Sequence, residues 1–196
     1  DRNIIASVGH SDAGFAQVME HIEYGLNKIT HMHNACSPHH HRKPGIVTAG
    51  FYSDDLFAEI IADGVHIHPD VLKTIFKIKG AERIILITDS LEAKGLEDGE
   101  YIVGGLAMIK KGNELRIENG KLAGSIMPMN LCAKYMFDNT DADIMDIVSM
   151  TSVNAAKLLK IDKSVSRIKE GYTADLVVLD EDFNVLSTFC RGEKIC

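Results

Sequence analysis

The feature that most constrains this chain is the repeated order of strand and helix signals in its first half. Four short apolar runs are typical of strands, and the last of them, "RIILIT", is apolar throughout, as expected for a strand buried on both faces. Between them, apolar residues recur at three- and four-residue spacing, which indicates helices. This order predicts parallel βα units. The strands are expected at residues 4–8, 28–32, 56–63 and 83–88, and the helices at 13–27 and 70–80.

The second half of the chain changes character twice. Gly and Asp-Gly turns separate short alternating runs between residues 95 and 125, which predicts hairpin strands inserted before the next helix. Helical patterns resume at 130–137 and again at 144–159. After residue 160, "SRIKEG", "ADLVVLD" and "NVLSTFCRG" have strand composition. These last strands follow the helices, so they need not join the parallel sheet.

Composition and charge limit the classes of function. The formal net charge of −7 argues against broad binding to nucleic acids or membrane surfaces, which requires clustered positive charge. No apolar run approaches the roughly 20 residues that span a bilayer. The four cysteines form no CxxC pair, which favours free thiols in a cytoplasmic, reducing compartment. The chain opens at Asp1, without a methionine and close to a strand pattern, so we expect a piece of a longer protein.

Histidine or aspartate follows each of the four predicted parallel strands. The carboxyl ends of such strands meet at one rim, where βα barrels build their active sites. Core packing gives no reason to place ionisable groups repeatedly at that depth. Imidazole is a preferred ligand of zinc or iron, and an aspartate beside metal-bound water can accept its proton. The pattern therefore predicts metal-assisted hydrolysis carried by residues from the set His10, His31, His66, His68 and Asp89.

Several motifs in fixed order carry a resemblance to a known family. "GHSDA", "THMHNA", "HHRKPG", "IIADGVHIHP", "LITDS" and "GKLAGS" resemble the N-acetylglucosamine-6-phosphate deacetylases of the amidohydrolase superfamily. The tail "NAAKLLKI…SRIKEGYTADLVVLD" is similar to the C-terminal signature of that superfamily. The resemblance covers only the C-terminal half of the family. Its metal-binding glutamate is expected upstream, so residues 1–196 alone are expected to be inactive.

The resemblance implies a fold and a division into domains. It implies an α/β fold in which residues 1–160 form the second half of a TIM-like (β/α)8 metal-dependent hydrolase barrel, with a β-rich insertion around 95–125. Residues 161–196 would supply strands of a small β-sandwich domain.

The resemblance also implies an activity, namely hydrolysis of the acetamide of N-acetylglucosamine 6-phosphate to glucosamine 6-phosphate and acetate. His10 and His31 match the metal ligands, with one or two divalent ions, zinc or iron, per subunit. Asp89 matches the catalytic aspartate that activates water. Arg42 matches an arginine that reaches the phosphate in the neighbouring subunit, which implies a homodimer. The remaining substrate contacts match Asn34, the backbone of Ala35, His66, Leu122 and Ala123.

Other histidines and other functions stay open at this point. His33 shares a strand face with His31 and is a conceivable ligand, although packing is the favoured interpretation. His68 is expected to be structural, and His39, His40 and His41 form a polar loop that could help to bind phosphate. One alternative function is another metal-dependent amidohydrolase, of the cyclic-amide type. A second is an incomplete, non-catalytic fragment, because about half of a barrel leaves open strand edges.

Overall fold

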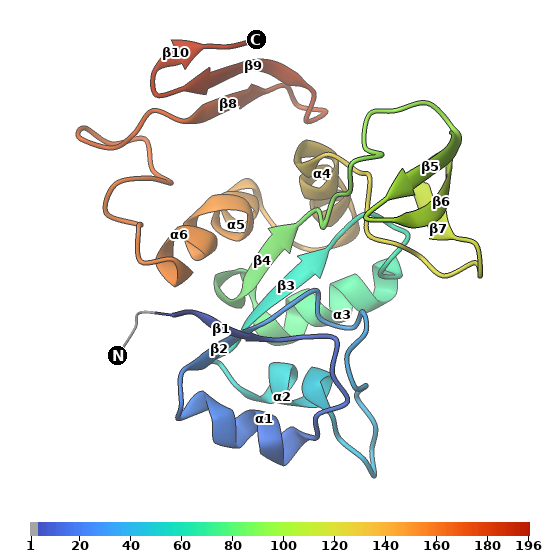
Figure 1. The fold of residues 1–196 in the computed structure, drawn as a ribbon. Coiled ribbons are helices and arrows are strands. Elements are labelled where there is room, and N and C mark those ends of the chain that lie inside the picture. The colour runs from blue at the N-terminus through green and yellow to red at the C-terminus, as the bar shows by residue number, and fades with distance from the viewer. Residues whose placement is uncertain (1–3) are drawn as a thin grey trace.

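The computed structural model describes residues 4–196 (Figure 1). A parallel sheet forms its centre, with strand order β1-β2-β3-β4 and every neighbouring pair parallel. Three helices alternate with these strands and lie together on one side of the sheet (Figure 1). The strands are β1 (Ala6–Val8), β2 (Leu26–Ile29), β3 (Phe57–Ile61) and β4 (Ile84–Ile87), and the helices are α1 (Phe15–Ile22), α2 (Ile46–Tyr52) and α3 (Pro69–Lys79).

Local sequence explains the bounds of α3. His68 precedes it in extended backbone, and its Nδ1 accepts a hydrogen bond from the backbone N–H of Asp70 at 3.2 Å. Proline occupies the first helical position, where its missing N–H costs nothing. Gly80 ends the helix with a φ of 65°, a conformation that glycine adopts without strain. The buried Leu72 and Ile75 face the main core, together with Ile29, Ile60, Ile84 and Leu86 of the sheet.

The inserted segment after β4 forms a sheet of its own. Strands β5 (Gly99–Val103), β6 (Leu106–Lys111) and β7 (Glu114–Ile117) pair antiparallel in chain order. They have a separate core made of Ala93, Val103, Met108, Leu115 and Ile126. In Figure 1 this sheet lies beyond the ends of β3 and β4, to the right. The insertion is therefore placed over the edge of the parallel sheet at which the strands end.

The last part of the chain comprises helices and a third sheet. A π-helical segment (Ser149–Val153) joins α5 (Ile144–Val148) to α6 (Asn154–Leu158). The third sheet is antiparallel, in the order β10-β9-β8, and lies at the top of Figure 1. The bounds of the remaining elements are Met129–Asn139 for α4, Leu176–Leu179 for β8, Val185–Cys190 for β9 and Glu193–Lys194 for β10. Within residues 4–196, no helix has the length and apolar character needed to cross a membrane.

The predicted parallel strands are confirmed, and several local predictions are wrong. Helix α2 was not predicted, the hairpin strands expected between residues 95 and 125 are β5, β6 and β7, and the strand expected in "SRIKEG" is irregular backbone with bends and one turn. The sequence of α2 has few good helix formers, so its helical pattern is weak. Tight packing holds it in place, because a Cβ on Gly50 would lie 2.7 Å from Ile29 Cδ1 and from Met32 Sδ. The predicted helix at 144–159 contains the π-helical segment.

Candidate active site

Four polar residues occupy the same position relative to the four parallel strands. Each lies two residues beyond the last residue of its strand: His10 after β1, His31 after β2, Asp63 after β3 and Asp89 after β4. Because the strands are parallel and adjacent, these residues line one edge of the sheet. The sequence analysis singled out three of them and missed Asp63. Its distance from the end of the strand was the signal that could have identified it.

Three of these four residues have a left-handed backbone. The φ angle is 45° at His10, 31° at His31 and 49° at Asp89. Residues with a Cβ seldom adopt this conformation, which costs on the order of 1–2 kcal/mol. Outliers of this kind are concentrated at functional sites, where the surrounding structure holds them in place. The turn out of β1, β2 and β4 is therefore strained at the residue that carries the imidazole or carboxylate.

The imidazoles of His10 and His31 face each other. Their Nε2 atoms are 2.9 Å apart, and the two rings meet edge to face with centroids 4.7 Å apart. On the other side of the ring, Nδ1 of His31 donates a hydrogen bond to the carbonyl oxygen of Asn34 at 3.0 Å. A carbonyl only accepts, so the hydrogen of His31 lies on Nδ1. The Nε2 of His31 therefore has its lone pair free and directed toward His10.

Backbone hydrogen bonds fix the two histidine loops to each other. The N–H of Ser11 donates to the carbonyl of Ala35, and the N–H of Ser37 donates to the carbonyl of Ser11, both at 3.1 Å. A Cβ on Gly9 would lie 2.8 Å from Cβ of Thr30, so β1 and β2 approach too closely there for a larger residue. The spacing of the two imidazoles thus follows from strand pairing and from these loop contacts.

The histidine pair fits two ligands of one metal ion. Two nitrogens that are each about 2.0–2.1 Å from a tetrahedral zinc would be about 3.3 Å apart, close to the observed 2.9 Å. The hydrogen bond from His31 Nδ1 to a backbone carbonyl is the arrangement that usually orients a histidine ligand. Among residues 4–196, no group of three or more His, Cys, Asp or Glu side chains could hold a metal. Within the described residues, His10 and His31 therefore form a pair without a third such side chain beside them, and Asp89 does not join them in one cluster.

Asp63 and His66 form a buried pair after β3. Oδ2 of Asp63 accepts a hydrogen bond from Nδ1 of His66 at 2.7 Å, and the two side chains are 2% and 6% exposed. Oδ1 accepts two further bonds, from the backbone N–H groups of Val65 and His66. Burial acts to raise the pKa of Asp63, but these hydrogen bonds outweigh it, and the pKa lies below its ordinary value. Asp63 is therefore ionised at neutral pH.

The segment that follows the insertion holds Asp89 through its backbone. The N–H of Ser125 donates to the carbonyl of Asp89 at 2.9 Å, and the N–H of Leu91 donates to the carbonyl of Ser125 at 3.1 Å. Gly124 has a φ of 63°, and a Cβ on it would lie 2.9 Å from the carbonyl oxygen of Asp89. In the same segment Ala123 donates to the carbonyl of Leu115, and Leu122 pairs with Arg116. Leu122 and Ala123 therefore lie beside β7, in the segment that leads to Ser125.

Asn34 and Ala35 follow His31 and present unused donors. Nδ2 of Asn34 is buried and has no hydrogen-bond partner in the described part of the chain. Ala35 has a φ of 48°, and its backbone N–H makes no hydrogen bond within residues 4–196. A buried donor without a partner, such as Nδ2 of Asn34, is rare in folded proteins, whereas Ala35 is exposed. Their position beside the histidine pair is consistent with an anionic or polar ligand that accepts from them.

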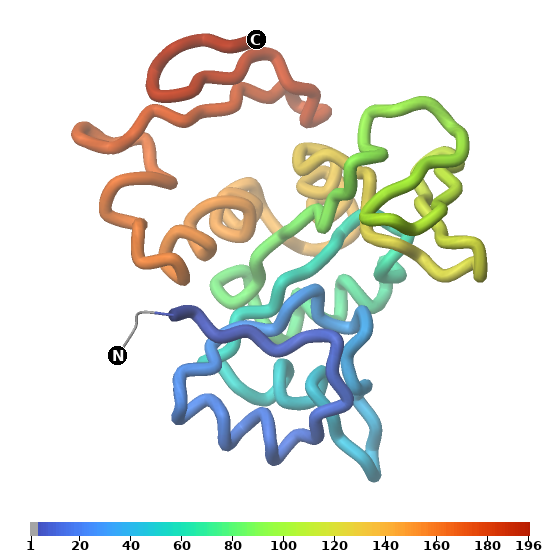
Figure 2. Tube along the Cα trace, viewed as in Figure 1, coloured from blue at the N-terminus to red at the C-terminus, as the bar shows by residue number. Residues whose placement is uncertain are grey.

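Arg42 lies apart from these residues, in an exposed loop. The loop at residues 38–44 projects from the body of the chain, near α1 and α2 (Figure 2). The Nη1 of Arg42 lies 2.5 Å from Nε2 of His41, and His41 stacks on His40 with ring centroids 4.7 Å apart. Within the described residues, Arg42 makes its side-chain contact with His41 and none with the histidine pair.

His33 and His68, which the sequence analysis also considered, make packing and helix-capping contacts. His33 packs against Phe51, with ring centroids 5.8 Å apart, and burial together with the nearby His39 lowers its pKa. His68 is largely exposed and caps α3. These surroundings favour packing for His33 and helix capping for His68, but the strand face that His33 was expected to share with His31 is wrong, because both residues lie in turns after β2.

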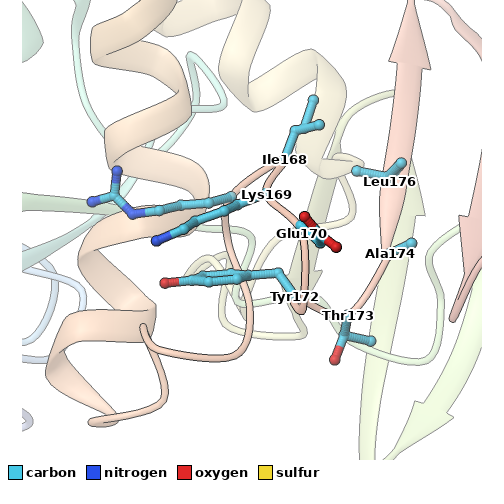
Figure 3. Close-up of a pocket in the computed structure, with 8 residues that line it drawn as sticks. Ile168, Lys169, Glu170, Tyr172, Thr173, Ala174 and Leu176 are labelled. Carbon is cyan, nitrogen blue, oxygen red and sulfur yellow. The ribbon is translucent and has the colours of Figure 1, made fainter.

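The hollow in Figure 3 does not belong to this site. It has a volume of about 240 Å³ and is lined by residues between Arg167 and Leu176. The ammonium group of Lys169 lies 5.6 Å from the centre of the Tyr172 ring, as the labelled side chains show. None of the residues at the ends of the parallel strands lines it.

Comparisons with known proteins give consistent relatives. An N-acetylglucosamine-6-phosphate deacetylase from Bacillus subtilis (strain 168) is 43% identical over 98% of this chain and 48% of its own length. One from Lysinibacillus sphaericus is 38% identical over 98% of this chain and 49% of its own. An N-acetylgalactosamine-6-phosphate deacetylase from Escherichia coli O157:H7 is 31% identical, with 98% and 51% covered. The chain spans about half the length of the curated relatives it matches.

Solved structures agree in fold. The crystal structure of N-acetylglucosamine-6-phosphate deacetylase from Thermotoga maritima superimposes with a TM-score of 0.95 at 40% identity, over 100% of this chain and 53% of that one. A Mycobacterium smegmatis deacetylase, an aspartate-to-alanine mutant in complex with N-acetyl-D-glucosamine-6-phosphate, gives 0.91 at 31% identity, over 97% and 51%. The predicted fold class, half of a TIM-like hydrolase barrel with strands of a small β domain, is confirmed.

The family itself follows from the sequence as a whole. The family model described as "Amidohydrolase family" matches residues 3–195, nearly the entire chain. The relatives named above match over the same length, and the paired histidines lie at the ends of adjacent parallel strands. The chain belongs to the amidohydrolase family.

Proposed function

We propose that this protein hydrolyses the acetamide of N-acetylglucosamine 6-phosphate and releases acetate and glucosamine 6-phosphate. The observation that carries the proposal is the pair of facing Nε2 atoms of His10 and His31, 2.9 Å apart at the ends of adjacent strands. The names of the relatives support the substrate, since those at 43% and 38% identity are glucosamine-type deacetylases and the galactosamine-type relatives are at 31% and 33%.

His10 and His31 would hold a divalent ion, zinc or iron, through Nε2. When bound, such an ion supplies Lewis acidity and lowers the pKa of water to about 7. The hydrogen bond from His31 Nδ1 to Asn34 keeps the ring oriented and the Nε2 lone pair available. A further protein ligand and a second ion are compatible with the site, because the described residues supply only two ligands.

Asp89 would move the protons of the reaction. Its carboxylate accepts a proton from the attacking water and returns it to the amine nitrogen as the C–N bond breaks. The left-handed backbone of Asp89 and the hydrogen bond from Ser125 to its carbonyl fix the main chain from which this carboxylate extends.

The phosphate end of the substrate would be held by donors near His31. Asn34 Nδ2 and the backbone N–H of Ala35 are unused donors, and Leu122 and Ala123 would line the pocket on the side of Asp89. Arg42 would reach the phosphate in the neighbouring active site of a homodimer, where its planar guanidinium suits bidentate contact. The four free cysteines support a cytoplasmic location.

The test is a deacetylation assay with both epimeric substrates. The chain is assayed as residues 1–196 and as the full reading frame in which it occurs, with added Zn²⁺ or Fe²⁺. Acetate release from N-acetylglucosamine 6-phosphate by the full reading frame, faster than from the galactosamine epimer, is expected. Absence of acetate from both substrates, in a folded and metal-loaded protein, would contradict the proposal.

Metal content gives the control for the histidine pair. His31→Asn is expected to lose most of the bound metal and the activity. The exposed capping residue offers a matched variant, and His68→Asn should keep both. Equal metal content in the two variants would remove His31 from the site.

A further inference from the structure

Asp63 is built into the same row as the histidine pair and Asp89, and the hydrolytic mechanism gives it no role. It lies two residues beyond β3 and is 5% exposed, one of few buried charged side chains in the described residues. Cys132 of helix α4 lies close enough to Asp63 to sense its charge. Burial together with this charge raises the pKa of the Cys132 thiol to about 12. An ionised carboxylate in such a place is costly unless it is fully hydrogen bonded.

The hydrogen bonds of Asp63 settle where the hydrogen of His66 lies. A carboxylate can only accept, so the 2.7 Å contact requires the hydrogen on Nδ1 of His66. The same carboxylate accepts two backbone N–H groups at 2.9 Å, which fixes its orientation. Nε2 of His66 makes no hydrogen bond to the described residues, and it is not among the buried atoms without a partner. It therefore keeps an unused lone pair, on a side chain that is 6% exposed.

We propose that Asp63 is a positioning residue that fixes the tautomer of His66, so that Nε2 meets the substrate as a hydrogen-bond acceptor. The proposal rests on the proposed function in one respect, namely that His66 contacts the substrate. It deepens that function by stating what His66 recognises: a hydrogen-bond donor, either a hydroxyl of the sugar ring or the N–H of the acetamide. The opposite tautomer would present N–H, which repels the N–H of the acetamide and which a hydroxyl can meet only by accepting instead of donating.

The variant Asp63→Asn tests the tautomer directly. The amide has one orientation that satisfies this loop, with its oxygen toward the two backbone N–H groups and its NH₂ toward Nδ1 of His66. The NH₂ group donates, so Nδ1 becomes an acceptor and the hydrogen moves to Nε2. Nitrogen-15 NMR of the histidine rings in residues 1–196 reports the tautomer without any substrate. The expected result is Nδ1–H in the unaltered chain and Nε2–H in Asp63→Asn.

A second aspartate–histidine pair supplies the matched control. Asp70 lies 3.6 Å from Nδ1 of His68, but both side chains are exposed, at 90% and 68%. Asp70→Asn should leave the His66 resonances unchanged. A His66 that already carries its hydrogen on Nε2 in the unaltered chain would overturn the proposal, even where Asp63→Asn fails to fold. So would a folded Asp63→Asn that keeps Nδ1–H.

Kinetics separate this proposal from the proposed function. In the protein that shows deacetylase activity, Asp63→Asn should lower kcat/KM roughly tenfold to a hundredfold, with Asp70→Asn unchanged. Asp63→Glu, which restores an acceptor, should recover part of the loss if its longer side chain reaches Nδ1. A changed tautomer with unchanged kcat/KM would contradict the positioning role. Failure of the proposed function would instead appear as inactivity of the unaltered protein, with the tautomer result standing.

Discussion

His31 illustrates how single residues of this site are specified by several contacts at once. Its backbone lies in the left-handed region, its Nδ1 donates to Asn34, and its Nε2 faces His10. The side chain is buried, at 6% exposure, so its alternatives are few. A ring held in this way directs the lone pair of its Nε2 in one direction, which is the property that a metal ligand requires.

Asp89→Asn is expected to keep the fold and most of the metal while it removes the base. An amide cannot accept the proton of the attacking water, so kcat should fall by about 10²–10⁴-fold. The measurement is kcat beside metal content and thermal stability, with the exposed Asp70→Asn as control. Near-normal turnover in Asp89→Asn would exclude Asp89 from proton transfer.

Lys79 predicts a pH dependence of stability. Its Nζ donates to the carbonyl of Ser53 at 2.7 Å, and burial lowers its pKa from 10.5 to about 8. The unfolded chain binds this proton more tightly, so the free energy of unfolding rises with pH between about 8 and 10.5. The rise from this group should be on the order of 3 kcal/mol. Urea unfolding of Lys79→Met, compared with the unaltered chain at each pH, should lack this contribution. Identical pH profiles for the two proteins would contradict it.

At the scale of elements, the strand ends and the loops that hold them define the site. Loops from neighbouring units brace three of these ends: Ser11 and Ala35 join the turns after β1 and β2, while Ser125 braces the turn after β4. The strained residues therefore persist because a second segment donates to or accepts from the same turn. The insertion is thus part of the support of Asp89, although it has its own core.

Gly124→Ala should disturb Asp89 across this contact. The new Cβ would lie 2.9 Å from the carbonyl oxygen of Asp89 and would occupy a left-handed backbone. A displaced carboxylate is expected to lower kcat by about tenfold to a hundredfold. Gly120 is the control, because its φ of 81° gives the same backbone strain while nothing lies within 4 Å of its Cβ. Equal losses of activity in Gly120→Ala and Gly124→Ala would show that strain alone, and not the contact with Asp89, is responsible.

The parallel strands were predictable from sequence, and the contacts between loops were not. Periodicity and apolar runs identify β1–β4, and His10 and Asp89 follow the predicted strands, whereas His31 was expected inside a strand over 28–32 that in fact ends at Ile29. The bond from Ser125 to Asp89 joins residues that are far apart in the chain, and no local pattern encodes it. Helix α2 was missed for a related reason, since packing of Gly50 against Ile29 and Met32, and not helix propensity, stabilises it.

At the scale of the whole molecule, buried contacts join the later segments to the parallel sheet. Phe183, which precedes β9, is buried in the main core and packs against Phe137 of α4, with ring centroids 5.5 Å apart. Nδ2 of Asn130 donates to the carbonyl of Phe183 at 3.0 Å. Asn154 makes the corresponding link for α6. These links explain why the terminal sheet, with many exposed apolar residues of its own, has a defined place.

Asn154→Ala should therefore destabilise the molecule more than the loss of one side chain on a surface would. Asn154 is fully buried at the start of α6. Its Nδ2 donates to the carbonyls of Ala81 and Ile84, at 2.7 and 2.8 Å, and these carbonyls lie just before and at the start of β4. Removing it leaves both carbonyls without this donor, at an expected cost of about 2 kcal/mol.

Urea unfolding measures this cost, and Asn139→Ala is the matched control. Nδ2 of Asn139 also donates to a backbone carbonyl, that of Tyr135 at 2.9 Å, but the bond stays within one end of α4 and is partly exposed. Its loss should cost about 1 kcal/mol or less. Asn154 joins the segment from α5 to α6 to the start of β4. Asn154→Ala should therefore also increase amide hydrogen exchange both in that helical segment and in β4, whereas Asn139→Ala should increase it in α4 alone. Exchange confined to α6 in Asn154→Ala would mean that the helical segment is not coupled to β4 through this side chain.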